Sequence, residues 1–567
     1  MSSLRQPRKA WPARLPECLE PPAVSIWESL AVSAARYPDK TAIVFFGRRI
    51  SYAELLSAAE RLAARLAELG VRQGDRVLVA MQNCPQLIVA HYAIARANAV
   101  AVPINPMNRA DELGHYIADS GARIAIALGE LARELVLASN QLDPGHQLHH
   151  LIWTSFRDAF DPATEDHGVP PQWSEWLQGM VEPIPLASGQ IHSWNDAVSS
   201  LALVPELIVG RDDLALLPYT SGTTGLPKGC KLTHASIVHN AIGTALWITG
   251  TSGMVALAVL PLFHITGLVC VLHGTIHAGG TLVLMPRWDR DIAARLILQN
   301  QISHWICIPT MIVDLLASPH VDEYDFSSLK FIGGGGAAMP QAVAEGLRKR
   351  IGLDFVEGYG LTETSAVTVF NPCDAPKLQC LGIPFISVDV RIVDLDTLTE
   401  VADGKSGEIV IHGPQVFSGY WQREAETAEA FIDVDGKRFF RTGDVGYRDG
   451  DGYLFMSDRL KRMINASGYK VWPAEVESLL YRHPAIQEAC VISARDAYRG
   501  ETVKAVVVLR PSGGPLSERE LIEWCRQHIS TYKIPRIIAF VDKLPKNASG
   551  KIMWRTLQEA EWERAAV

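Results

Sequence analysis

The sequence lacks both an excess of positive charge and any paired-cysteine motif. Its 53 Lys and Arg residues stand against 62 Asp and Glu residues, which leaves a formal net charge of -9. Such a chain has no bulk positive field to attract a phosphate backbone, and this disfavours a nucleic-acid partner. The nine cysteines are scattered and none belongs to a C-x-x-C pair. This pattern predicts free thiols in a reducing compartment, here the cytoplasm, and disfavours a zinc site.

Long apolar runs are also scarce. Residues 254–276 contain no Lys, Arg, Asp or Glu, and a run of this length could span a bilayer. Because Pro261, His264 and Gly267 interrupt it, we expect a buried strand, a loop and a helix instead of a transmembrane segment. His273 and His277 lack an accompanying H-E-x-x-H motif, so we expect them to be polar residues of that packed helix.

No apolar core of signal-peptide length follows the basic residues near the N-terminus. We therefore expect residues 1–24 to form a loose arm. The chain has 567 residues, of which 48% are hydrophobic and 20% charged. This is a globular composition, and the length is too great for a single compact core.

Hydrophobic periodicity indicates the fold class. Ser51 and Glu54 form a capping box ahead of leucines at helical spacing. Apolar strands at residues 77–81 and 99–103 flank a helix expected at 85–95. Strands that alternate with helices predict a parallel sheet that is covered on both faces.

Changes in composition indicate further units. Residues 143–201 are rich in Pro, His, Trp and acidic residues, and we expect a surface excursion there. Residues 380–458 contain short strands and Asp-Gly turns, which are typical of a small antiparallel, β-barrel-like subdomain. We predict an α/β fold, with a large N-terminal domain of parallel sheets at 25–460 and a smaller C-terminal α/β domain at 461–567.

The most informative segment is the glycine- and hydroxyl-rich stretch Tyr219–Gly229. Its close-set backbone N–H groups, its hydroxyls and Lys228 are suited to binding a polyphosphate. It is not a Walker loop, because Pro227 stands where the second glycine belongs and Gly229 where the magnesium-binding hydroxyl belongs.

A second glycine run, at residues 333–338, formally matches a dinucleotide-binding fingerprint. Asp354 follows at the spacing where that fingerprint has an acidic residue that binds the ribose. A Rossmann-type dehydrogenase is therefore an alternative. Against it, Pro340 is a natural first helical residue, so the next helix would begin after the glycines instead of among them.

Seven segments occur in the order seen in adenylate-forming enzymes. They are Tyr219–Gly229, Pro261–Gly267, Gly335–Pro340, Gly358–Glu363, Arg441–Asp444, Asp458–Glu477 and Pro545–Lys551. Over roughly residues 25–560 the chain resembles the acyl-CoA synthetase branch of that superfamily. The resemblance implies a carboxylic acid:CoA ligase that uses ATP, Mg²⁺ and coenzyme A. The acid and ATP would form acyl-AMP and pyrophosphate, and CoA would then displace AMP. A homodimer is compatible with this resemblance.

The resemblance also implies roles for individual residues. A carboxylate must attack the α-phosphorus of ATP, and two unit charges 4 Å apart repel by roughly 4 kcal/mol at an effective dielectric of about 20. Lys551 is expected to bridge the two reactants as charge develops. Glu363 is expected to bind Mg²⁺, and Thr362 to donate to the α-phosphate. The residues assigned to the β- and γ-phosphates are Thr220, Ser221, Gly222, Thr223, Thr224, Gly225 and Lys228.

The same comparison places the nucleoside and the second half-reaction. Asp444 and Arg459 are expected to bind the ribose. The C-terminal domain is expected to be a mobile lid that rotates about Lys461, and Arg462 departs from the commonest family pattern at the next position. The adenine is assigned to Gly336, Ala337, Ala338 and the ring of Tyr359, and the CoA tunnel to Ser467 and Gly468.

The acid is the least specified reactant. In the peptide-synthetase adenylation domains that this chain resembles, an Asp just after the Phe of the second motif holds the amino group of the substrate. Here no acidic residue follows Phe263, which disfavours an amino-acid substrate. The resemblance places His264 at the junction of acyl pocket and thiol tunnel. The predicted pocket residues are small or apolar, and they suit a medium- or long-chain fatty acid or an aromatic acid. They are Ala241, Gly243, His264, Leu268, Gly334, Gly335 and Gly360. A stand-alone adenylation enzyme that loads a carrier protein is an alternative, because the same fold serves both thiols.

Overall fold

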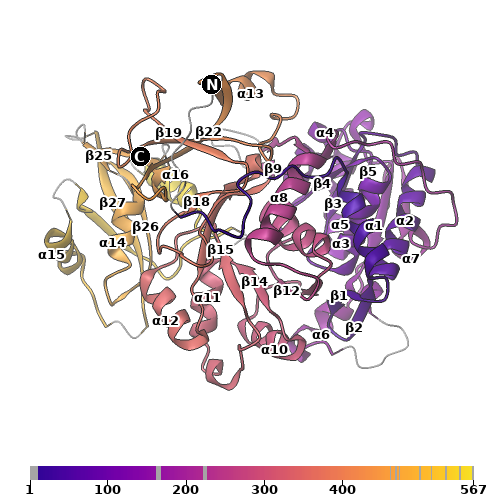
Figure 1. Ribbon diagram of the computed structural model, residues 1–567, viewed down its shortest axis with the longest axis horizontal. Helices are drawn as coiled ribbons and strands as arrows, with labels where there is room; N and C mark the ends of the chain where they lie inside the picture. The colour runs from indigo at the N-terminus through magenta and orange to yellow at the C-terminus, as the bar shows by residue number, and fades with distance from the viewer. Residues whose placement is uncertain are drawn as a thin grey trace.

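The computed structural model describes residues 10–160, 168–220, 227–459, 462–466, 469–471, 473–496, 500–511, 514–529, 533–547 and 551–564. Its larger part contains two mostly parallel sheets flanked by helices, together with an antiparallel subdomain. A smaller C-terminal domain, yellow in Figure 1, is drawn on the same side of the view as α12 (Gln341–Ile351) and on the opposite side from α2 (Tyr52–Glu68). The predicted α/β fold class is confirmed.

The first sheet has nine strands. Its central strands pair in parallel, and only the outer strands β2, β17 and β18 pair antiparallel to their neighbours. In spatial order they are β18 (Ile383–Pro384), β17 (Ala366–Phe370), β16 (Val356–Leu361), β15 (Phe331–Gly334), β14 (His304–Cys307), β12 (Val255–Ala258), β13 (Thr281–Leu284), β1 (Thr41–Phe45) and β2 (Arg48–Ser51).

The second sheet has seven strands, of which only β11 is antiparallel. In order they are β11 (Leu232–Thr233), β8 (Leu214–Leu216), β4 (Val100–Pro103), β3 (Arg76–Ala80), β5 (Ile124–Leu128), β6 (His150–Thr154) and β7 (Gln190–Ser193). The helices of this large domain are α1 (Ile26–Arg36), α2, α3 (Pro85–Arg96), α4 (Ala110–Ser120), α5 (Gly129–Gln141), α6 (Pro171–Gln178), α7 (Trp194–Ala197), α8 (His234–Trp247), α9 (Gly274–His277), α10 (Arg290–Asn300), α11 (Pro309–Leu316), α12 and α13 (Glu424–Glu429).

Local sequence signals account for many element boundaries. The Ser51 hydroxyl accepts the Glu54 N–H at 3.2 Å and the Glu54 carboxylate accepts the Ser51 N–H at 2.7 Å, so the predicted capping box starts α2. Pro85 is the first residue of α3, where its missing N–H costs no intrahelical bond. Pro340 is the residue before α12 instead of its first residue.

The antiparallel subdomain is a five-stranded sheet whose turns were visible in the sequence. Asp435 and Gly436 both have positive φ, as a tight turn between β21 and β22 requires. The strands are β19 (Asp389–Val393), β20 (Gly407–His412), β21 (Phe431–Val434), β22 (Lys437–Arg448) and β23 (Leu454–Arg459).

The C-terminal domain is a second five-stranded sheet with three helices. Its strands are β24 (Ile464–Ala466), β25 (Tyr469–Val471), β26 (Ile486–Asp496), β27 (Gly500–Leu509) and β28 (Ile537–Phe540), and its helices are α14 (Pro473–Leu480), α15 (Glu518–His528) and α16 (Trp554–Arg564). Ser517 and Glu520 form a capping box at the start of α15.

Within segment 143–201, the described strands belong to the core and not to the surface excursion that the composition suggested. The segment supplies β6 and β7, which extend the seven-stranded sheet beyond β5. Trp173 and Trp194 are buried, and Trp173 packs edge-on against Phe46. Apolar surface of this size is buried because the segment continues the core, so the expectation for these residues was wrong.

The part of the N-terminal segment that the structure describes is not a loose arm. Trp11 packs edge-on against Trp247 with ring centroids 5.5 Å apart. Arg14 donates to the carbonyl oxygens of Leu246 and Trp247 at the C-terminus of α8, where a cation is favoured by the helix dipole. Residues 10–24 are therefore docked on the large domain, which corrects that expectation.

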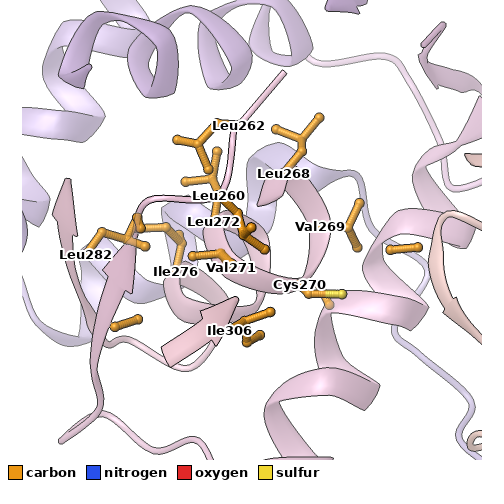
Figure 2. Close-up of a cluster of buried hydrophobic side chains, with 14 of the residues drawn as sticks. Leu260, Leu262, Leu268, Val269, Cys270, Val271, Leu272, Ile276, Leu282 and Ile306 are labelled. Carbon is orange, nitrogen blue, oxygen red and sulfur yellow. The ribbon is translucent and has the colours of Figure 1, made fainter. Parts of the chain in front are cut away.

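The uncharged run 254–276 forms core structure, as expected. After β12, residues Thr266–His273 form a π-helix that continues into α9. Figure 2 shows Leu268, Val271 and Leu272 in one cluster with Leu282 of β13. His273 is buried at the end of the π-helix. No helix of the described residues is long and apolar enough to cross a membrane.

Candidate active site

The two ends of the glycine- and hydroxyl-rich segment pair with each other. β9 (Tyr219–Thr220) and β10 (Lys228–Gly229) form an antiparallel ladder in which Thr220 lies opposite Lys228. The side chains of Thr220 and Lys228 are therefore brought together at the base of the predicted phosphate loop. The assigned residues Ser221, Gly222, Thr223, Thr224 and Gly225 lie outside the described residues.

Glu363 lies at the end of β16, in a single 3-10 turn, Thr362–Thr364. Its backbone carbonyl accepts the Phe417 N–H at 2.8 Å, and its carboxylate Oε1 accepts the Tyr420 hydroxyl at 3.1 Å. Among the described residues, no three His, Cys, Asp or Glu side chains are arranged to hold a metal. Mg²⁺ usually takes one or two carboxylates together with substrate phosphates, so a half-buried Glu363 fits that ion without a larger cluster.

The predicted adenine and ribose residues are brought together. The Tyr359 hydroxyl donates to Asp444 Oδ2 at 2.6 Å, and both side chains are buried. Asp444 also pairs with Arg459 across β22 and β23, although the Arg459 side chain lies outside the described part. Gly336, Ala337 and Ala338 are exposed in the loop after β15, where a flat ring could reach them.

Close backbone approach accounts for three of the glycines assigned to the acyl pocket. A Cβ on Gly334 would overlap the carbonyl of Cys307, one on Gly335 that of Gly358, and one on Gly360 that of Ala366. Only glycine fits where neighbouring backbones come this close. Packing between adjacent strands therefore requires these glycines, whatever ligand lies nearby.

The other predicted acyl-pocket residues are closed off. Ala241, Gly243 and Leu268 are buried. A Cβ on Gly243 would lie 2.6 Å from the Phe385 ring, which in turn packs 5.0 Å from the ring of Trp247. The side of α8 that carries Gly243 is thus covered by aromatic side chains.

His264 of the large domain lies close enough to Lys551 of the small domain for their charges to interact. Part of the His264 side chain is exposed, and protein atoms crowd its ring. This crowding, and then the positive charge of Lys551, lower the pKa of His264 to about 4. The exposed Lys551 lies in a turn where its N–H donates to Asn547 Oδ1 at 2.9 Å and its carbonyl accepts the Asn547 N–H.

Two residues near the site were missed by sequence reasoning. Tyr420, described above, lies in a loop with no recognisable motif signal. Glu357 is buried in β16 and accepts the N–H groups of Met339 at 3.2 Å and Gln379 at 2.8 Å. Its burial raises its pKa to about 7 despite these bonds. A charged residue inside an otherwise apolar strand was the available signal for Glu357.

Comparisons with known proteins agree with this arrangement of site residues. The family model of AMP-binding enzymes matches residues 30–421, and that of the AMP-binding enzyme C-terminal domain matches 475–551. The chain belongs to the AMP-binding enzyme family. The identification of an adenylate-forming enzyme from the acyl-CoA synthetase branch, an AMP-forming acid–thiol ligase, is confirmed.

Relatives of this AMP-binding enzyme match over nearly the whole chain. A long-chain-fatty-acid–CoA ligase of Bacillus subtilis is 35% identical over 98% of the chain and 99% of the relative. A feruloyl-CoA synthase of Amycolatopsis is also 35% identical, over 91% and 95%. The crystal structure of ATP-bound MatB from Rhodopseudomonas palustris superposes with a TM-score of 0.79 at 27% identity, covering 95% of this chain and 99% of that one. The dehydrogenase alternative is not supported.

The first described residue after the predicted hinge is anchored to the small domain of the enzyme. Arg462 donates to both carboxylate oxygens of Glu477 in α14 and to the Val491 carbonyl at 3.2 Å. Its guanidinium lies 5.5 Å from the Trp554 ring centroid. Arg462, the departure noted in the sequence, is therefore held by the C-terminal domain. The predicted hinge and tunnel residues Lys461, Ser467 and Gly468 lie outside the described residues.

Proposed function

We propose that this enzyme joins a medium- or long-chain fatty acid, or an aromatic acid, to coenzyme A at the cleft between its two domains. The carboxylate oxygen bonds to the α-phosphorus of ATP while the bond to pyrophosphate breaks. The CoA sulfur then bonds to the acyl carbon, its proton is lost, and AMP leaves. ATP and CoA are thus substrates that are consumed in turn.

The observation that carries the proposal is the position of Lys551. A cation from the small domain lies close enough to His264 of the large domain to depress its pKa. With that pKa, His264 is neutral near pH 7, so it adds no second positive charge. Lys551 is then the cation that meets the carboxylate and the α-phosphate, where a preorganised charge lowers the barrier most.

The other reactant groups are assigned to residues around this cleft. Thr220 and Lys228 hold the β- and γ-phosphates, Thr362 donates to the α-phosphate, and Asp444 holds the ribose beside Tyr359. Mg²⁺, held by Glu363, would neutralise charge on the phosphate oxygens. Arg459, Ser467 and Gly468 retain the ribose and tunnel roles implied by the family resemblance.

The choice of acid is supported by the relatives named above, which include both fatty-acid and feruloyl ligases. We place the reaction in the cytoplasm, and all nine cysteines are free thiols, as a reducing compartment requires. A homodimer belongs to the same proposal.

A panel of fatty and aromatic acids, scored by AMP release with ATP and CoA, tests this function. We expect AMP release with one of the two acid classes and none without acid. If AMP forms only when a carrier protein bearing a pantetheine arm replaces CoA, the carrier-loading alternative holds instead. Absence of acid-dependent AMP across the panel with both thiols would overturn the proposal.

A further inference from the structure

A short segment of the antiparallel subdomain crosses to the predicted phosphate loop. The Lys231 N–H donates to the Gly419 carbonyl at 3.0 Å, and the Trp421 N–H donates to the Gly229 carbonyl at 2.8 Å. Between these bonds, Cys230 and Tyr420 form an isolated antiparallel bridge. This pairing fixes Tyr420 directly beside the C-terminal end of the loop.

Tyr420 contacts two charged residues of the proposed site at once. Its hydroxyl donates to Glu363 Oε1 at 3.1 Å, and its ring centroid lies 5.3 Å from Lys228 Nζ. An ammonium group at this distance from the face of a tyrosine ring is attracted to it. A tyrosine hydroxyl is protonated near pH 7, so it can donate to the Glu363 carboxylate.

The same segment also holds the other end of the loop. The Tyr219 hydroxyl donates to Asp119 Oδ2 at 2.7 Å, Arg423 Nη2 donates to Asp119 Oδ1 at 2.8 Å, and Trp421 Nε1 donates to the Asp119 carbonyl at 3.0 Å. Asp119 therefore joins the start of the loop to the residues that follow Tyr420. Both described ends of the loop, β9 and β10, are tied to this segment, so Tyr420 is held beside these two strands.

The charges explain why a tyrosine is useful here. Lys228 and Glu363 carry opposite charges, and both contact Tyr420. Lys228 lies over the face of its ring, and Glu363 accepts its hydroxyl. Lys228 Nζ also lies 3.8 Å from Glu426 Oε1, so the ring is one of two features that hold the ammonium. A direct pair with Glu363 would make the ammonium less available to a phosphate and the carboxylate less available to a cation. The Tyr420 side chain keeps them apart and orients each of them separately.

We propose that Tyr420 is a positioning residue that orients Glu363 toward a metal–nucleotide complex through its hydroxyl and Lys228 toward the phosphates through its ring. This inference rests on the proposed function, because both partners are assigned there. The Tyr420 hydroxyl and the Tyr420 ring make separate contributions, and substitutions can remove the hydroxyl alone or both together.

Calorimetric titration with ATP, in Mg²⁺ and in EDTA, tests the inference without any acid or CoA. Tyr420→Phe removes only the hydroxyl, and we expect MgATP to bind about three- to tenfold more weakly with metal-free ATP unchanged. Tyr420→Leu also removes the ring, and we expect both forms of ATP to bind more weakly. Tyr453→Phe is the matched control, since its hydroxyl donates to the Ala375 carbonyl at 2.8 Å. We expect it to bind both forms as the unmodified enzyme does.

The outcomes separate this inference from the proposed function. If the unmodified enzyme binds no MgATP, the proposed function fails. The inference is overturned if the unmodified enzyme binds MgATP and Tyr420→Phe binds it with the same affinity. It is also overturned if Tyr420→Phe weakens the binding of metal-free ATP as much as that of MgATP. Thermal unfolding of each variant shows whether it is folded. If Tyr420→Leu does not fold, the comparison of Tyr420→Phe with Tyr453→Phe still tests whether the Tyr420 hydroxyl contributes to MgATP binding.

Discussion

The hydroxyl of Tyr359 donates to Asp444 Oδ2 at 2.6 Å, which links strand β16 of the nine-stranded sheet to strand β22 of the antiparallel subdomain. The two residues are 85 positions apart in the sequence. The bond orients the carboxylate that we assign to the ribose by means of the side chain that we assign to the adenine. Nucleotide binding is therefore expected to depend on both.

Asp444→Asn should raise the KM for ATP by about ten- to a hundredfold, because hydrogen bonds to a charged acceptor are the stronger ones. Tyr359→Phe should raise it less, by about three- to tenfold, since the carboxylate stays but loses its orienting donor. Initial rates at varied ATP measure both effects. Equal KM values for Tyr359→Phe and the unmodified enzyme would show that this bond does not orient Asp444 for the nucleotide.

Lys551→Ala should abolish acid-dependent exchange of pyrophosphate into ATP. It should leave thioester formation from supplied acyl-adenylate largely intact, because the cation is needed only while the two anions react. Lys546→Ala is the control, since Lys546 pairs with Glu488 inside the small domain. Comparable loss of both half-reactions in Lys551→Ala would contradict the assigned role.

Four buried histidines should make the enzyme sensitive to acid. Burial lowers the pKa of His91, His234 and His239 to about 4 and that of His273 to about 3. The unfolded chain binds these protons below about pH 6.5 and the folded chain does not, so stability falls as the pH drops from there toward 4.

His91→Leu removes one of these groups, whose ring nitrogens have no hydrogen-bond partner among the described residues. Between pH 7.5 and 5 the variant should lose about 2 kcal/mol less free energy of unfolding than the unmodified enzyme. Urea unfolding at the two pH values measures this difference. His146 is exposed, so His146→Gln should lose as much free energy of unfolding between the two pH values as the unmodified enzyme. An equal loss in His91→Leu would refute the prediction.

Gly243→Ala should push the Phe385 ring away from α8, because the new Cβ would lie 2.6 Å from it. If this region borders the acyl group, kcat/KM should fall more for the bulkiest accepted acid than for the smallest. Adding Phe385→Leu should restore part of the loss by shortening the displaced side chain. The exposed Gly253→Ala serves as the control, and a uniform loss for all acids would place the acyl group elsewhere.

Lys461→Pro should leave pyrophosphate exchange near its normal rate and slow thioester formation, because a proline limits the backbone rotation that the predicted hinge requires. Arg462 is held by Glu477 of the small domain, so we expect the backbone change to occur before it. Single-turnover thiolation of preformed acyl-adenylate measures the second step. An unchanged thiolation rate would move the hinge away from residue 461.

The sequence by itself determined the local elements and the family. Ser51 with Glu54, the Asp435-Gly436 turn and the proline at the start of α14 act on adjacent backbone groups, so their effect is readable from neighbouring residues. The ordered motifs identified the adenylate-forming family in the same way. Each motif is contiguous, and its residue types are required by the chemistry of phosphate and ribose.

Only the tertiary structure decided which distant residues meet. Tyr420 lies beside Lys228 and Glu363 because its neighbours Gly419 and Trp421 form hydrogen bonds with the end of the phosphate loop. No sequence pattern predicts those hydrogen bonds. Strands β6 and β7 were not predicted from residues 143–201, because they are ordered by the pairing of β6 with β5 and of β7 with β6, and their composition does not indicate this pairing. Local conformation follows from neighbours along the chain, whereas such contacts depend on sheet register and on the packing of the whole core.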